Sequence, residues 1–284
     1  MKHAWIIRMS NPTQAPAAGF AAATQPIAVS TRIHTDTQGI HAGWAEIPLP
    51  DPEFPRLQAY RAAPIAQAHH PVILVVQEIF GVHEHIQDVV RRLAKLGYYA
   101  IAPELFHRQG DVSGLPLEAV RALVPKVADS EVLADLDSTL AFASGEGGDA
   151  SRAGLTGFCW GGRIAWLYAA HQPRLKAAVA WYGRLQGEAT ANQPRFPVDV
   201  AARIKTPVLG LYGGADAGIP LISINDIDIR LKAAESPSQI HVYPDAPHAF
   251  FADYRPSYRA EAAEDGWHRL KDWFRIHLGA PAES

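Results

Sequence analysis

A single cysteine lies in a glycine-rich turn that would hold it ready for chemistry. The stretch Gly157-Phe158-Cys159-Trp160-Gly161-Gly162 follows an apolar run and precedes a segment with helical character. Strand, sharp turn and helix with the pattern G-x-C-x-G are typical of a nucleophile elbow, with Cys where Ser is usual. Glycines make room for strained backbone at the apex, and a helix N-terminus favours the thiolate. The alternative is a buried, inert cysteine in a structural turn.

A cysteine nucleophile needs a base and a third group that orients the base, and both have candidates later in the chain. Asp216 follows the predicted strand at 207–212, and His248 follows the predicted strand at 239–243. The order nucleophile, acid, base is the one that such hydrolases use. Asp226 and Asp228 compete for the role of the acid, and a turn Asp or a loop His remains the structural alternative for either residue.

Glu78 ends the apolar strand predicted at 71–76, so its carboxylate either faces solvent or enters the site. In the site it would take the thiol proton or hold the thiol inactive. The backbone N–H groups of Ile79 and Trp160 are predicted to form an oxyanion hole. The cluster His83-Glu84-His85 lacks the second His of an H-E-x-x-H zinc site, so we expect it at the surface where a helix starts.

Strands and helices alternate from residue 71 onward, which indicates a mostly parallel sheet with helices on both faces. Such a sheet gathers functional side chains at the carboxyl ends of its strands. Before residue 71, Thr-rich alternating segments at 30–35 and 40–47 predict a hairpin turning at Gln38-Gly39, with a third strand at 57–62. We expect an antiparallel N-terminal edge, a flexible leader over 1–28, and one domain over 29–284.

Composition excludes several classes of function. The net charge of -3 over 284 residues implies no strong attraction to nucleic acid or anionic lipid. One cysteine excludes an intramolecular disulfide and Cys-rich zinc sites, and favours a reducing, cytoplasmic compartment. No apolar run reaches the length of a membrane span. The oligomeric state, monomer or dimer, stays open.

Four stretches together resemble the dienelactone hydrolase (carboxymethylenebutenolidase) family, over roughly residues 30–278. They are Gln77-Glu78-Ile79-Phe80-Gly81-Val82, the Cys159 elbow, Tyr212-Gly213-Gly214-Ala215-Asp216 and Pro244-Asp245-Ala246-Pro247-His248-Ala249-Phe250. The resemblance implies an α/β-hydrolase fold and hydrolysis of a lactone through an acyl-thioester, without a cofactor. It also implies Cys159 as nucleophile, His248 and Asp216 as its partners, and Glu78 as acceptor of the thiol proton when substrate binds.

The substrate-binding residues carry over less well than the catalytic ones. The family's characterised enzymes hold a substrate carboxylate with arginines, one of them four residues after the histidine, where this chain has Ala252. We therefore expect Arg255 or the loop residue Arg108 to serve instead, with Tyr182 as a further contact. A general carboxylesterase is the runner-up among enzymes. A thiol redox sensor or a small-molecule binder on a hydrolase scaffold is the alternative from another class.

Overall fold

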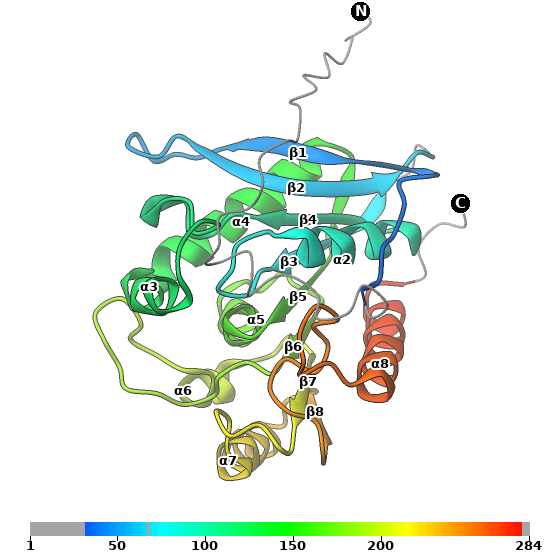
Figure 1. The fold of residues 1–284 in the computed structure, drawn as a ribbon. Coiled ribbons are helices and arrows are strands. Elements are labelled where there is room, and N and C mark those ends of the chain that lie inside the picture. Colours follow the sequence, from blue (N-terminus) through cyan, green and yellow to red (C-terminus); the bar gives the residue numbers. More distant parts are fainter. Residues whose placement is uncertain (1–31, 67–68, 280–284) are drawn as a thin grey trace, which may run out of the picture.

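A computed structural model of the protein describes residues 32–66 and 69–279, and one eight-stranded sheet runs through it (Figure 1). The strand order is β1-β2-β4-β3-β5-β6-β7-β8. The strands are β1 (Ile40–Pro48), β2 (Arg56–Pro64), β3 (His70–Val76), β4 (Tyr99–Pro103), β5 (Gly148–Phe158), β6 (Ala177–Trp181), β7 (Val208–Gly213) and β8 (Gln239–Tyr243). From β4 to β8 neighbouring strands are parallel, whereas β1 and β2 pair antiparallel and so does β2 with β4.

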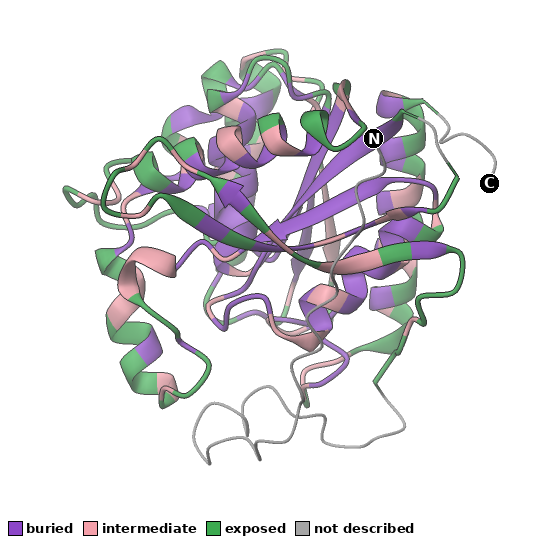
Figure 2. Ribbon diagram, turned by 90° about the horizontal axis from the view of Figure 1, so that it is seen from above, coloured by how far each residue is buried: buried purple, intermediate pink, exposed green. Residues whose placement is uncertain are grey.

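Helices cover both faces of this sheet, as the alternating pattern predicts. They are α2 (Glu84–Lys95), α3 (Leu117–Leu123), α4 (Asp129–Gly145), α5 (Trp160–His171), α6 (Pro197–Val200), α7 (Leu221–Ala233) and α8 (Ala260–Leu278), with short 3₁₀ turns at His107–Gln109, Val124–Lys126 and Ala201–Arg203. Figure 1 shows α8 on the opposite side of the strands from α5 and α7. The middle strands are buried on both faces (Figure 2), which explains why β3 is continuously apolar rather than alternating.

The N-terminal hairpin differs from the prediction. Residues 32–37 form no strand, and β1 pairs with β2 across the proline-rich loop instead, with Ile40 opposite Pro64. The segment before β1 is held by side chains: the Ile33 N–H donates to Asp253 at 2.9 Å and the Thr35 N–H to Asp88 at 2.6 Å. Two carboxylates therefore take the main-chain donors that a partner strand would have taken.

Other boundaries move by a few residues. β5 begins at Gly148, within a stretch predicted as loop, because it continues alongside the start of β3. The terminal helix α8 begins at Ala260 rather than at Tyr258. The predicted surface excursion at 184–203 contains α6 and a 3₁₀ turn. The predicted leader, residues 1–28, lies outside the described residues.

This topology places the predicted chemistry along one edge of the sheet. β3, β5, β6, β7 and β8 are consecutive parallel neighbours, so their carboxyl ends lie on the same side. The residues that follow four of these strands are Glu78, Cys159, Asp216 and His248. Each of the predicted catalytic residues therefore arrives at the same edge on its own strand end.

Candidate active site

Cys159 sits at the apex of a tight turn between β5 and α5. Its backbone has φ 56° and ψ -112°, a region that costs energy for a residue with a side chain. The turn is so close that a Cβ on Gly157 would lie 2.1 Å from the Gly161 carbonyl oxygen. A Cβ on Gly161 would lie 2.4 Å from the carbonyl oxygen of Val76 in β3. The glycines on either side of Cys159 are therefore required by contact between backbones.

His248 connects Cys159 with Asp216. Its Nε2 lies 3.2 Å from the Cys159 Sγ, and its Nδ1 lies 2.6 Å from Oδ2 of Asp216. The other Asp216 oxygen, Oδ1, accepts the Gly218 N–H at 2.8 Å, so the carboxylate is fixed at both ends. These three groups have the geometry of a nucleophile, its base and the residue that orients the base.

The charge of His248 is stabilised at this position. Burial would lower the pKa of the imidazole, but hydrogen bonds and charge from Asp216 and Cys159 outweigh burial and raise the pKa to about 10. At neutral pH the ring is therefore an imidazolium next to the sulfur of Cys159.

The two competing acids lie on α7 and are occupied there. Asp226 accepts from Arg230 at 2.9 Å, and Asp228 from Lys232. Asp216 is thus the acid that His248 contacts.

Three of the four described non-glycine residues with positive φ gather around this site. They are Cys159, Tyr182 and Ala249, with φ of 56°, 38° and 59°. Tyr182 follows β6, and its ring packs edge-on against His248 at 5.2 Å between centroids. Strained backbone concentrated in one place is common at functional sites, because the surrounding structure must enforce it.

The predicted oxyanion donors occupy suitable backbone positions. Trp160 is the first residue of α5, so its N–H has no acceptor within the helix. Ile79 follows β3 in the turn that packs against the elbow, since Gly161 is pressed against the carbonyls of Val76 and Gln77. Their role in binding an oxyanion stays a prediction.

Glu78 is fully buried rather than solvated, with 1% of its surface exposed. The Tyr254 hydroxyl donates to its Oε2, and His83 Nε2 lies 3.6 Å from the same oxygen. Burial alone would raise the pKa of this carboxyl, but His83 and the charge of Arg255 bring the pKa down to about 2. Glu78 is thus a carboxylate at neutral pH, held by Tyr254 while Cys159 contacts His248.

His83 and Tyr254 are site residues that the sequence prediction missed. The expectation that His83 lies at the surface is wrong, because its side chain is 10% exposed and faces Glu78. The turn at Gly81, with φ 74°, brings His83 back to the carboxylate five residues earlier. A polar pattern at a helix start gives no sign of this, although the glycine marks the turn.

The two arginines predicted to bind substrate have different surroundings. The Arg255 guanidinium lies over the rings of Phe80 and Tyr254, at 5.3 and 6.0 Å, and makes no hydrogen bond or ion pair with another described residue. Arg108 is held within the fold: its guanidinium makes two hydrogen bonds to Asp135, at 2.5 and 3.0 Å, while its Nε has no hydrogen-bond partner among the described residues. Its role in substrate binding stays a prediction.

The Tyr182 hydroxyl is a further polar group of the site. It is buried and has no hydrogen-bond partner among the described residues. Burial, with the charges of Glu78 and Cys159, raises the pKa of this phenol well above its usual range. It is therefore a neutral O–H donor close to the nucleophile.

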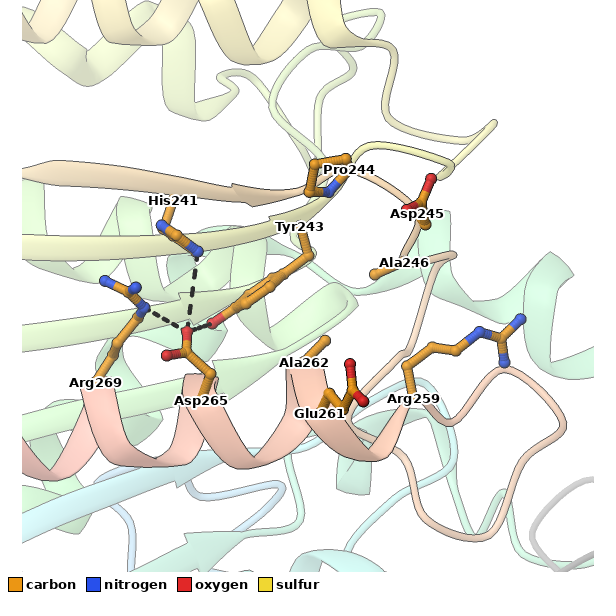
Figure 3. Close-up of a pocket in the computed structure, with 10 residues that line it drawn as sticks. All are labelled: His241, Tyr243, Pro244, Asp245, Ala246, Arg259, Glu261, Ala262, Asp265 and Arg269. Carbon is orange, nitrogen blue, oxygen red and sulfur yellow. Dashed lines mark hydrogen bonds and ion pairs between the residues drawn. The ribbon is translucent and has the colours of Figure 1, made fainter.

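A separate groove of about 470 Å³ lies between β8 and α8 (Figure 3). Inside it Asp265 accepts hydrogen bonds from Tyr243 at 2.7 Å and Arg269 at 2.6 Å. None of the predicted catalytic residues lines this groove. Asp265 pairs there with Arg269, whereas Asp245, Arg259 and Glu261 form no ion pair with another described residue. Within the described part of the chain, no three His, Cys, Asp or Glu side chains form a group that could hold a metal ion.

Comparison with known proteins agrees with this geometry. Residues 57–278 match the sequence model of the dienelactone hydrolase family. A protein of Methylorubrum extorquens named "Putative carboxymethylenebutenolidase" is 60% identical over 262 residues, which cover 91% of this chain and 89% of the relative. A protein of the same name from Escherichia coli K12 is 53% identical over 265 residues, or 92% of this chain and 96% of the relative.

The similarity extends to a solved structure. The crystal structure described as "Putative Dienelactone Hydrolase" from Klebsiella pneumoniae superposes with a TM-score of 0.80 at 53% identity. It covers 83% of this chain and 98% of that chain. The predicted α/β-hydrolase fold with an antiparallel N-terminal edge is thereby confirmed. No helix among residues 32–66 and 69–279 is long and apolar enough to span a membrane.

Proposed function

Because the chain belongs to the dienelactone hydrolase family, a family of hydrolases, we propose that it opens small lactones or esters through a thioester on Cys159. The observation that carries this is the contact of His248 with both the Cys159 sulfur and Asp216. A thioester route suits activated esters and lactones better than amides. Cys159 is also the only cysteine of the chain, so no other thiol competes for the role.

The cycle starts from a thiol, the Glu78 carboxylate and the His248 imidazolium. As substrate binds, Glu78 takes the thiol proton, and the thiolate attacks the carbonyl carbon to form a C–S bond. The N–H groups of Ile79 and Trp160 receive the oxyanion. Collapse of this intermediate breaks the ester C–O bond, and the His248 imidazolium gives its proton to the leaving oxygen.

In deacylation, water replaces the thiol as the nucleophile, and His248 acts as a base instead of an acid. Neutral His248 takes a proton from a water molecule, whose oxygen attacks the thioester carbonyl. The C–S bond breaks, the acid leaves, and the thiolate recovers its proton from Glu78. Asp216 stabilises the imidazolium in each half of the cycle. At the end of the cycle Cys159, Glu78 and His248 have regained their starting protonation states, and the proposed cycle uses no cofactor.

We assign substrate binding to Arg255 and Tyr182. The Arg255 guanidinium contacts the rings of Phe80 and Tyr254 but makes no hydrogen bond or ion pair with another described residue, and a planar guanidinium suits a carboxylate. The Tyr182 hydroxyl adds a neutral donor beside His248. Together they favour a small substrate that carries a negatively charged group near its ester or lactone.

A panel of lactones and aryl esters tests the proposal, with wild type compared against Cys159→Ser, Cys159→Ala and Glu78→Gln. We expect turnover by wild type, an acyl adduct on Cys159 by mass spectrometry, and a loss of activity in Cys159→Ala. Glu78→Gln should slow acylation, and a variant equal to wild type would remove Glu78 from the cycle. Absence of turnover together with rapid, reversible peroxide oxidation of Cys159 would favour a redox thiol instead.

A further inference from the structure

The side chains of Tyr254 and His83 converge on one oxygen of Glu78. Oε2 of Glu78 accepts the Tyr254 hydroxyl and lies 3.6 Å from His83 Nε2. The His83 and Tyr254 rings also touch, edge to face, with centroids 5.0 Å apart. The 3.6 Å separation suits electrostatic attraction but exceeds an ordinary N–H···O hydrogen bond. Tyr254 is therefore the direct donor, and His83 supports the same oxygen from the side.

The other oxygen of Glu78 has a different environment. Oε1 is buried and has no hydrogen-bond partner among the described residues. A buried polar atom normally has at least one hydrogen-bond partner, because an unpaired acceptor costs free energy. Oε2 is contacted by Tyr254 and His83, whereas Oε1 has no such contact, so Oε1 is available to accept a proton.

The wider surroundings keep His83 in place. Its ring packs against Phe80 at 6.2 Å and against His85 at 6.1 Å, and His85 bonds to Asp253 at 2.9 Å. Asp253 directly precedes Tyr254 in the chain, so one loop carries both the donor to Glu78 and the partner of His85.

The charged and titratable groups that face His83 are Glu78, Tyr254, His85 and Arg255. Burial lowers the pKa of His83, and the Glu78 carboxylate opposes this effect.

We propose that His83 and Tyr254 are positioning residues for Glu78: they hold Oε2 and leave Oε1 as the atom that takes the thiol proton. This rests on the proposed function of Glu78 and names the residues through which that function is set. In the transfer the S–H bond breaks, an O–H bond forms at Oε1, and the electron pair remains on sulfur. Neither positioning residue touches the reacting sulfur in this arrangement.

The test uses Tyr254→Phe and His83→Phe, which keep the aromatic packing and remove the polar atoms. Removing donors from a carboxylate raises its pKa. In both variants we expect the acid limb of the kcat/KM profile to move to higher pH. At pH values below the midpoint of this limb, activity relative to that at pH 8 should fall at least about threefold, as for a shift of half a pH unit. Combining either change with Glu78→Gln should abolish the shift.

Tyr99→Phe is the matched control, because it removes a buried tyrosine hydroxyl that has no hydrogen-bond partner among the described residues and lies on β4, away from Glu78. It should leave the pH profile unchanged. Thermal unfolding of each variant checks that the fold is intact. An equal drop in activity at every pH, with the acid limb unmoved in both Phe variants, would show a merely structural contact and overturn the proposal.

A second readout separates this inference from the proposed function. Alkylation by iodoacetamide reports on Cys159 alone, since the chain has one cysteine, and it needs no turnover. If wild type hydrolyses nothing but the alkylation profile still shifts in Tyr254→Phe and His83→Phe, the positioning role stands and the hydrolase proposal fails. If turnover occurs and neither profile shifts, the positioning role is wrong.

Discussion

Oδ2 of Asp216 lies 2.6 Å from Nδ1 of His248, whose opposite nitrogen contacts the nucleophile at 3.2 Å. This contact fixes both the orientation of the ring and the nitrogen that carries its proton. Asp216→Asn should therefore leave the fold intact and lower kcat by about 10³–10⁴-fold, since the amide no longer supports the imidazolium. Steady-state kinetics on an activated ester measure the loss.

Asp226→Asn is the control for Asp216→Asn, because Asp226 lies on α7 and pairs with Arg230. Its activity should equal that of wild type. An Asp216→Asn enzyme with wild-type kcat would show that another group orients His248.

Arg255→Ala tests substrate recognition, and Arg108→Ala is its matched control. Arg255→Ala should raise KM by about 10–100-fold for esters that carry a carboxylate, the range expected for a charged hydrogen bond, and change it little for neutral esters. Arg108→Ala should leave KM unchanged but lower the free energy of unfolding by about 3 kcal/mol, because it removes the guanidinium from the buried Asp135 carboxylate and leaves only His107 in contact with it. Equal KM values of Arg255→Ala and wild type on charged esters would exclude Arg255 from binding.

Gly161→Ala should fail to fold or lose more than about 3 kcal/mol of stability. The added Cβ would lie 2.4 Å from the Val76 carbonyl, and neither backbone segment is free to move away. Denaturant unfolding gives the measurement. Gly43→Ala in β1 is the control, since nothing lies within 4 Å of the added atom there, and a variant Gly161→Ala as stable as this control would contradict the packing argument.

Glu104 gives the stability of the fold a pH dependence near neutrality. Its carboxylate accepts the Val82 N–H at 2.7 Å, and burial raises its pKa to about 7 against an ordinary 4.5. The folded state therefore binds more protons than the unfolded state between these two values, so stability falls as pH rises through this window. The change is about 3 kcal/mol at most.

Glu104→Gln keeps an oxygen for Val82 and cannot ionise. Its melting temperature should vary less than that of wild type between pH 5 and pH 8, with the variant gaining most at the higher pH. An identical pH dependence in the two proteins would mean that Glu104 is already ionised throughout this range.

The sequence predicts the central sheet and the triad because both depend on local patterns in chain order. Strand and helix alternate after residue 71, and each catalytic residue follows a strand by a few positions, so a parallel sheet brings them to one edge. The hairpin prediction failed because Asp253 and Asp88, far along the chain, take the donors of residues 33 and 35. The burial of His83 was misjudged for a similar reason, since its contact with Glu78 depends on the turn at Gly81, which no periodicity predicts.

The contacts of residues 33 and 35 with Asp253 and Asp88 determine how far the N-terminal segment can be removed. Asp253, which receives the Ile33 N–H, stands next to Tyr254 in the chain, so the lead-in to β1 and the loop that holds Glu78 share an anchor. Proteolytic trimming that stops before residue 32 should leave turnover unchanged. Trimming to residue 39 should loosen that loop and reduce turnover, although every strand of the sheet would remain.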